Sequence, residues 1–193
     1  TDLGFGEGMG FNAAVLESVL QPDGKILYSG NFTSFNGATR NRIARLNADG
    51  TLDETFAANL GANNSIGALV LQPDGKILIG GFFTEYDGVV RNRIARLNAD
   101  GTLDPTFDPG TGADLQLHSI AIQVDGKIVI GGLFTTYNST PRNRVARLNQ
   151  DGSLDTTFDP GTGASFTILT IAIQQDGRIL IGGQFVNYNG TLR

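Results

Sequence analysis

An aromatic residue, an amide or carboxylate and an arginine occur in the same order four times along the chain. An exposed ring beside such groups can stack on a sugar while the polar groups bind its hydroxyls. The candidate binding residues are Phe35, Tyr86, Tyr137 and Tyr188, then Asn36, Asp87, Asn138 and Asn189, and finally Arg40, Arg91 and Arg142. A structural role explains the same pattern: the Asn-Gly pair is a turn, the ring packs between units and the arginine pairs with a carboxylate.

Catalytic chemistry has little basis in this sequence. His118 is the only histidine and cysteine is absent, so a multi-histidine zinc site and a thiol nucleophile are excluded. No Ser, His and acid constellation is evident either. Glu17 and His118 occupy positions at which the repeated units differ most, and we expect both at the mouth of a central channel. We expect no catalytic residue, metal ligand or cofactor; the alternative is a metal-dependent, lactonase-like hydrolase with its site at that mouth.

Charged residues also recur within apolar segments. Arg42 and Arg45 lie in RIARLN, and Asp53, with its equivalents Asp104 and Asp155, lies in the segment that follows. A buried charge needs a partner, because an unpaired one is costly. We therefore predict bidentate arginine to aspartate pairs, or arginine bonds to loop carbonyls, that hold neighbouring units together.

The composition is that of an acidic, glycine-rich folded chain. The 193 residues include 27 glycines, 40% hydrophobic and 17% charged residues, and the formal net charge is -5. This charge disfavours nucleic acid as a partner, because phosphate binding relies on clustered Lys and Arg. No apolar run approaches the roughly 20 residues that span a bilayer, so membrane insertion is not expected. The glycine content predicts many turns.

The chain is a tandem repeat. Phe5, Phe56, Phe107 and Phe158 are each 51 residues apart, and a fixed period of this order is typical of solenoids and propellers. We assign a single repeat domain over 1–193, with units of approximately 1–51, 52–102, 103–153 and 154–193.

Each unit is predicted to contain four short strands, which we call a, b, c and d. Strand a resembles 118–123, strand b 127–132, strand c 42–47 and strand d 51–56. An Asp-Gly pair separates a from b and c from d, and glycine accepts the positive φ that tight hairpins require. Longer loops, such as 83–92, join b to c and d to the next a. No segment sustains a helical period.

Sheets of this kind are apolar on both faces, so each needs a neighbouring sheet. We therefore predict an all-β fold: a β-propeller-like array of four 51-residue, four-stranded blades. A linear β-solenoid is the alternative. The a–b and c–d turns then lie on one face, and the b–c and d–a loops lie on the other, which we call the long-loop face. Binding usually resides on loops of a rigid scaffold, so this face is the candidate site.

The repeated signatures resemble those of the delta-60 repeat family. The signatures are QxDGKILIGG, the F-T-x-Y/F-N/D-G loop, R-N-x-I/V-A-R-L-N and D-G-T/S-L-D, and they cover the whole chain. This resemblance implies tandem repeats of the β-propeller class in bacterial surface or secreted proteins. It brings no catalytic residues, and the 51-residue step is shorter than the usual unit of the family.

The last unit lacks the stretch equivalent to 41–51, which is strand c and its turn, so the last blade lacks one strand. We expect a portion of a longer array; a strand from another molecule, or pairing of free edges with a second copy, are the alternatives. The expected function is a non-enzymatic structural and interaction module, extracellular or on the cell surface, that binds a protein or glycan on its long-loop face. Self-association through unpaired strand edges is a further expected property.

Overall fold

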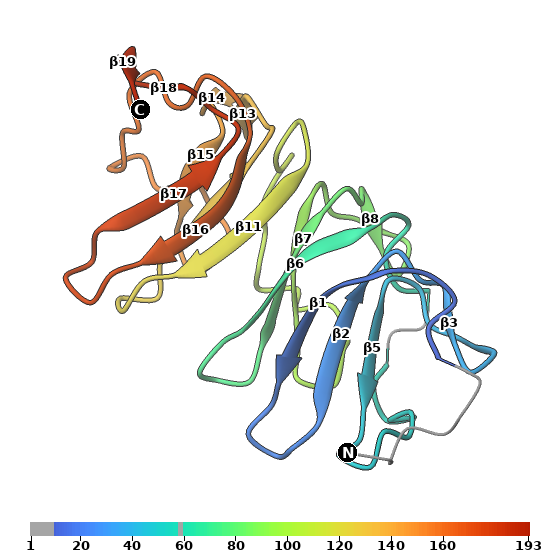
Figure 1. The fold of residues 1–193 in the computed structure, drawn as a ribbon. Helices are drawn as coiled ribbons and strands as arrows, with labels where there is room; N and C mark the ends of the chain where they lie inside the picture. The colour runs from blue at the N-terminus through green and yellow to red at the C-terminus, as the bar shows by residue number, and fades with distance from the viewer. Residues whose placement is uncertain (1–9, 58–59) are drawn as a thin grey trace.

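The computed structural model describes residues 10–57 and 60–193, which form strands, turns and loops and no α-helix (Figure 1). Each of the first three blades is a three-stranded antiparallel sheet, and the fourth has two strands. The blades contain β1 (Val15–Leu20), β2 (Ile26–Gly30) and β5 (Ile43–Leu46); β6 (Ile66–Leu71), β7 (Ile77–Gly81) and β10 (Ile94–Leu97); β11 (Leu117–Ile122), β12 (Ile128–Gly132) and β15 (Val145–Leu148); and β16 (Ile168–Ile173) and β17 (Ile179–Gly183). The all-β prediction is confirmed.

The predicted strand d is shorter than the sequence suggests. It is reduced to one bridging residue per blade, because Leu52 pairs only with Leu46, and the next two blades repeat this isolated bridge. The extended conformation ends at Asp53, whose Oδ1 accepts hydrogen bonds from the N–H and the hydroxyl of Thr55 at 3.0 and 2.6 Å. Such a local turn competes with strand pairing. The predicted first strand, TDLGF at 1–5, lies outside the described residues.

The long b–c loops contain a second set of hairpins, which the sequence analysis assigned only as loops. These are β3 (Ser34–Phe35) with β4 (Ala38–Thr39), β8 (Glu85–Tyr86) with β9 (Val89–Val90), β13 (Thr136–Tyr137) with β14 (Thr140–Pro141), and β18 (Asn187–Tyr188) with β19 (Thr191–Leu192). The first turns at Asn36 and Gly37, whose φ angles are 48° and 81°. Two consecutive positive φ angles are the signature of a type I′ hairpin turn.

A bulge in each inner strand explains the second glycine of the Gly-Gly pairs. In the second blade Ile66 pairs with Gly81 and Ala68 with Gly80, so Gly67 is the extra residue of the bulge. A Cβ atom on Gly81 would lie 2.2 Å from the carbonyl oxygen of Ser65. Only glycine therefore fits opposite the bulge.

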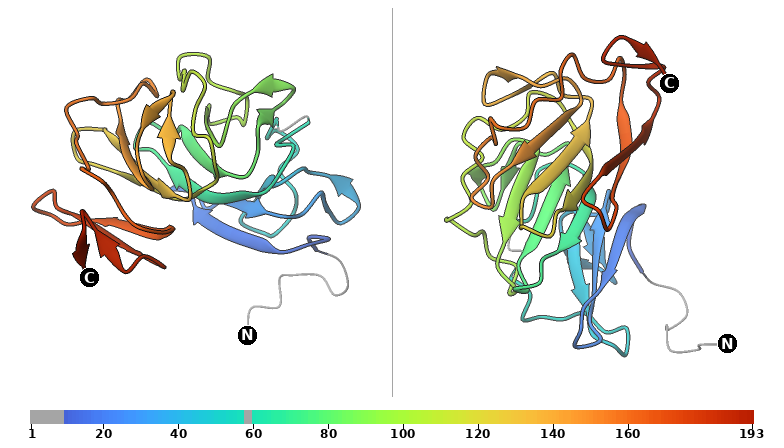
Figure 2. Two further views of the ribbon diagram at one scale, coloured as in Figure 1. Left: turned by 90° about the horizontal axis from the view of Figure 1, so that it is seen from above. Right: turned by 90° about the vertical axis from the view of Figure 1, so that its left-hand side faces the viewer.

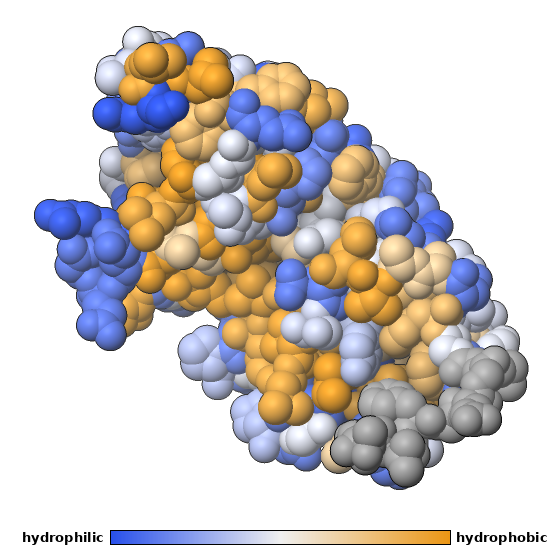
Figure 3. All heavy atoms as spheres, in the orientation of Figure 1, coloured by the Kyte–Doolittle hydropathy of each residue, from blue (hydrophilic) through white to orange (hydrophobic). Residues whose placement is uncertain are grey.

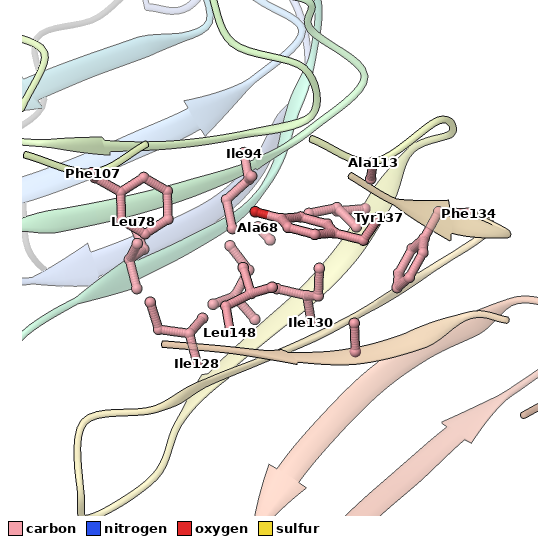
Figure 4. Close-up of a cluster of buried hydrophobic side chains, with 13 residues drawn as sticks. Ala68, Leu78, Ile94, Phe107, Ala113, Ile128, Ile130, Phe134, Tyr137 and Leu148 are labelled. Atoms are coloured by element: carbon pink, nitrogen blue, oxygen red, sulfur yellow. The ribbon is translucent and has the colours of Figure 1, made fainter. Parts of the chain in front are cut away.

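The hydrophobic core lies between blades (Figure 4). One cluster joins Leu78 and Ile94 of the second blade to Ile128, Ile130 and other residues of the third. The five residues of β7 are all buried, as are those of β12. Both faces of these sheets are therefore covered by neighbouring sheets, as predicted from their two-sided apolar pattern.

The four blades form an open arc, with the inner strands β1, β6, β11 and β16 side by side along its inside (Figure 2). The first and the last blade flank the open side. Leu16 and Leu20 of β1 are 48% and 68% exposed, and Leu169 and Leu180 of the last blade are 45% and 52% exposed. Figure 3 shows hydrophobic side chains over these end blades. The outer faces of the end blades are thus apolar and exposed.

Replacing Gly81 with alanine should destabilise the fold by about 2 kcal/mol or more, because its Cβ would collide with backbone rather than with a flexible side chain. Urea unfolding measures this difference. The matched control is Gly67→Ala. Gly67 is the extra residue of the same bulge, and a Cβ atom there would have no other heavy atom within 4 Å. Equal losses for both variants would contradict the bulge explanation.

Candidate functional site

The two ends of the blades differ in the length and chemistry of their loops. At one end, short Asp-Gly turns join β1 to β2 and join β5 to the bridging residue Leu52. In the first of these turns, the N–H of Gly24 donates to the carbonyl of Gln21 at 3.0 Å. The hairpins β3–β4, β8–β9, β13–β14 and β18–β19 belong to the opposite end (Figure 1). This second end is the predicted long-loop face.

The aromatic residues proposed for sugar stacking lie in the core. Tyr86 and Tyr137 have no exposed surface and Phe35 is 6% exposed, whereas Tyr188 of the last blade is partly exposed. The Tyr86 hydroxyl donates to the carbonyl of Gly101 at 2.9 Å, and burial raises its pKa well above the usual range. In the first three blades, these rings therefore pack in the core and are not available for sugar stacking, because a two-residue turn points each ring inward.

The residues next to these rings are turn residues that tie loops together. Asn36, Asp87, Asn138 and Asn189 all have positive φ angles. The Asp87 carboxylate accepts bonds from the N–H groups of Leu60 and Gly61 at 2.9 and 2.7 Å. Asn138 makes the equivalent bond to the N–H of Thr111, and Asn189 to that of Gly163. Asp87, Asn138 and Asn189 therefore connect the hairpins of the second, third and fourth blades to d–a loops.

The three candidate arginines bind mainly their own loops. Arg40 donates to the carbonyl of Thr39 and to the exposed carboxylate of Glu54 at 2.7 and 2.9 Å. Arg91 and Arg142 each donate to the carbonyl of the preceding residue at 2.8 Å. Their Nε atoms have no hydrogen-bond partner within the described ranges. These arginines lie on the long-loop face, but the rings of Phe35, Tyr86 and Tyr137 in the same hairpins are buried.

Apolar side chains gather on the long-loop face instead, and the sequence analysis missed them. The exposed large hydrophobic residues of its loops are Leu60, Phe82, Val89, Val90, Leu115, Phe166, Val186 and Leu192. Within the described residues, Val124 is the exposed large hydrophobic residue in the short turns themselves, and the exposed Leu20 and Leu180 lie on strands of the end blades next to such turns. The missed signal is the Val89-Val90 pair, which directly follows an Asp-Gly turn and so lies at a hairpin tip.

Glu17 and His118 lie on inner strands of different blades, β1 and β11. His118 is the bulge residue of its strand and contacts the ring of Phe82 edge-on, with a centroid separation of 5.7 Å. Burial lowers the pKa of His118. In the part of the chain that the structure describes, no three His, Asp or Glu groups are placed to hold a metal ion.

The arginines and aspartates of the blades form buried ion pairs. Asp104 accepts from Arg96 Nε at 2.7 Å and from Lys76 Nζ at 2.8 Å, and the same pairs recur at Asp53 and Asp155. The pairing itself is confirmed, but it is not bidentate, because one arginine nitrogen binds the carboxylate and another reaches the next blade. Arg96 Nη1 donates to the carbonyl of Gln150 at 2.5 Å.

Arg42 has a different role from Arg45. It has a φ of 68° and its Nη1 donates to the carbonyl of Asn31, and its equivalents repeat both features. Arg45 binds Asp53 and, through Nη1, the carbonyl of Ala99 in the next blade at 2.6 Å. The predicted link between blades is thus confirmed for the second arginine of the pair.

These contacts set the ionisation of the aspartates. Burial alone raises the pKa of Asp104, but hydrogen bonds from Lys76, Thr106 and Arg96 outweigh it and hold that pKa well below its usual range. Asp53 has the same balance of causes. For Asp155, the bonds from Lys127 and Thr157 are the main causes of a lowered pKa. The charged form of each aspartate is therefore part of the folded state.

A family model described as "Domain of unknown function (DUF5122) beta-propeller" matches residues 21–56, 72–107, 123–158 and 174–193. Successive matches begin 51 residues apart, in agreement with the repeat. No curated protein shows significant sequence similarity to the chain. Within the described residues, no helix is long and apolar enough to cross a membrane.

Solved structures show the same fold at low sequence identity. The WD40 beta propeller domain of Doa1 superposes with a TM-score of 0.59 at 19% identity, over 89% of this chain and 48% of that one. PorZ, a bacterial surface component of the type-IX secretion system of Porphyromonas gingivalis, gives 0.54 at 16% identity, over 88% and 24%. The extracellular domain of BT4673 from B. thetaiotaomicron gives 0.50 at 14% identity, over 90% and 21%. The chain therefore spans less than half of each of these proteins, and the propeller fold is confirmed.

Arg96→Ala should destabilise the protein by about 2–3 kcal/mol, because it removes a buried bond to Asp104 and the bond to the next blade. The matched control is Arg147→Ala. Arg147 keeps the aspartate bond but is more exposed, 21% against 9%, and the described residues give it no carbonyl of a following blade. Its loss should be about 1 kcal/mol smaller. Equal losses in urea unfolding would contradict a link between blades.

The lowered pKa values predict a loss of stability in acid. Each aspartate is charged in the folded state at a pH where its unfolded form, with a pKa of about 3.9, is already protonated. The free energy of unfolding should therefore be constant above about pH 5 and fall as the pH drops below about 4. Urea unfolding at a series of pH values across this range measures how steeply the free energy of unfolding depends on pH. Asp104→Asn should make the slope shallower, and an unchanged slope would contradict the assignment.

Proposed function

Because the chain belongs to the DUF5122 beta-propeller family, we propose that it is a non-enzymatic propeller module that binds another protein through its long-loop face. The observation that carries this proposal is the distribution of exposed apolar side chains. Residues such as Val89 and Val90, at 43% and 61% exposure, lie in the loops of that face, whereas in the short turns of the opposite face the described residues include one such side chain, Val124. Exposed apolar groups rimmed by polar residues are typical of protein interfaces.

The loops of this face are held in place, which favours binding. The side chains of Asp87, Asn138 and Asn189 connect each hairpin to a neighbouring loop. An ordered surface loses little conformational entropy when a partner binds. A glycan is the less favoured partner, because Tyr86 and Tyr137 are fully buried and offer no ring for stacking.

The residues on the inner strands also support the proposed non-enzymatic role. The positions equivalent to Glu17 are Ala68, Ser119 and Thr170, and those equivalent to His118 are Leu16, Gly67 and Leu169. A central catalytic site needs unlike polar groups that converge from several blades. These strands bring mainly apolar or small residues to that place, so a scaffold role fits them better than hydrolysis.

We also propose that the protein lies on the cell surface or in the extracellular space of a bacterium, as part of a longer repeat protein. The resemblance to delta-60 repeats supports this location. Two proteins of similar fold are described as an extracellular domain and as a bacterial surface component. The chain also spans only 21% and 24% of those proteins, which fits a module within a larger assembly.

A photoreactive amino acid at Val90 should crosslink to a distinct protein in the producing cells, and one at Val124 should not. Val124 is a matched control because it is a fully exposed valine on the opposite face. Serine at positions 89 and 90 should weaken binding of the identified protein about tenfold, as the loss of apolar contacts predicts. No crosslink at Val90, the same crosslinks at both positions, or a crosslinked polysaccharide would contradict the proposal.

A further inference from the structure

The last blade has an apolar groove along its outer strand. The groove has a volume of about 370 Å³ and is lined by Val145 and Phe158 of the third blade and by Ile179, Ile181, Phe185, Tyr188 and Arg193 of the fourth. Ile179, Ile181 and Phe185 are partly exposed here, whereas their equivalents in the third blade, Ile128, Ile130 and Phe134, have no exposed surface. Something specific therefore covers the equivalent residues in the other blades.

That cover is strand c of the same blade. Between the second and third blades, Ala146 and Leu148 of β15 complete the cluster that contains Ile128, Ile130 and Phe134. Between the first and second blades, Ala95 and Leu97 of β10 do the same. The cluster at the last blade contains the other members of the set but no alanine and leucine from such a strand within the described residues.

The backbone of β17 offers the matching edge. β7 pairs with β6 on one side and β10 on the other, with Ile77 opposite Leu97 and Ile79 opposite Ala95. Among the described strands, β17 pairs with β16 alone. The same register would place a leucine opposite Ile179 and an alanine opposite Ile181. A free strand edge beside an apolar pocket is the geometry used in β-strand addition.

Four polar groups around the groove correspond to groups that bind the strand c segment elsewhere. Arg96 Nη1, the Asp108 N–H and the Tyr137 hydroxyl donate to the carbonyls of Gln150, Asp151 and Gly152 at 2.5, 2.7 and 2.7 Å, and Lys127 binds the carboxylate of Asp155 at 2.8 Å. Their equivalents in the last blade are Arg147, Asp159, Tyr188 and Arg178. None of these has such a partner within residues 10–57 and 60–193.

We propose that this groove is a binding site for an extended segment with the sequence pattern of β10 and its turn, R-N-R-I/V-A-R-L-N-x-D-G-x-L-D, supplied by another repeat unit of this type. Alanine and leucine fill the apolar groove, the backbone pairs with β17, and three successive carbonyls of the turn accept bonds from Arg147, Asp159 and Tyr188. The final aspartate binds Arg178. The sheet face of a second copy supplies neither these carbonyls nor the aspartate in this geometry, so the occupant is a strand and its turn.

A synthetic peptide with the sequence of residues 91–104, RNRIARLNADGTLD, tests this site directly. Titrated into the full chain, the labelled peptide should bind one to one, measured by fluorescence anisotropy and calorimetry. Hydrogen exchange should show new protection at 179–183. A scrambled peptide of the same composition controls for attraction between a basic peptide and the acidic protein, and it should bind at least about tenfold more weakly.

Two protein variants separate the groove from the rest of the strand. Ile181→Ser, inside the groove, should weaken binding about tenfold, whereas Leu180→Ser, which is 52% exposed on the same strand and does not line the groove, should leave it unchanged. Arg178→Gln should weaken binding less than Ile181→Ser does, because it removes one exposed ionic contact. It also keeps the test available if the groove variant fails to fold.

Three outcomes would overturn the proposal. The first is equal binding of the authentic and scrambled peptides. The second is protection that maps away from 179–183. The third is a protein that sedimentation shows to be a dimer, with 179–183 already protected and unaffected by the peptide, which would identify a second copy as the occupant.

Discussion

The sheets of the two central blades are apolar on both faces, and a sheet of three short strands cannot cover itself. β7 and β12 are buried along their whole lengths only because another sheet lies against each side. The unit of stability is therefore the interface between two blades rather than the blade. Arginine reinforces that interface, since Arg96 binds an aspartate of its own blade and a carbonyl of the next one.

The same constraint shapes the two ends of the blades. At the end with short turns, Asp-Gly pairs close the hairpins and arginine reaches the turn of the neighbouring blade. At the long-loop end, hairpins and d–a loops hold each other through side chains such as Asp87. The loops are thus fixed to a rigid scaffold while their tips, such as Val89 and Val90, remain exposed. This combination gives the molecule an ordered surface that differs in chemistry from its opposite end.

Sequence alone predicts the period, the all-β class and the pairing of arginine with aspartate, because these depend on strict repetition and on the cost of unpaired charge. It does not predict that strand d shrinks to one bridge, because the turn at Asp53 depends on side-chain hydrogen bonds that compete with the ladder. The sequence also does not predict the direction in which the Tyr86 ring points. An aromatic residue before an Asp-Gly turn fits an exposed site as well as a core position, and only the hairpin twist decides between them.

Each inner strand contacts the inner strand of the next blade: β1 contacts β6, β6 contacts β11, and β11 contacts β16. Thermodynamically, such a molecule behaves as a one-dimensional chain with coupling between nearest neighbours. Duplicating the gene segment for one unit adds one blade and one interface, and this interface uses the same residues as the existing interfaces between blades. Evolution can therefore lengthen or shorten the array in whole steps, without inventing a new core each time.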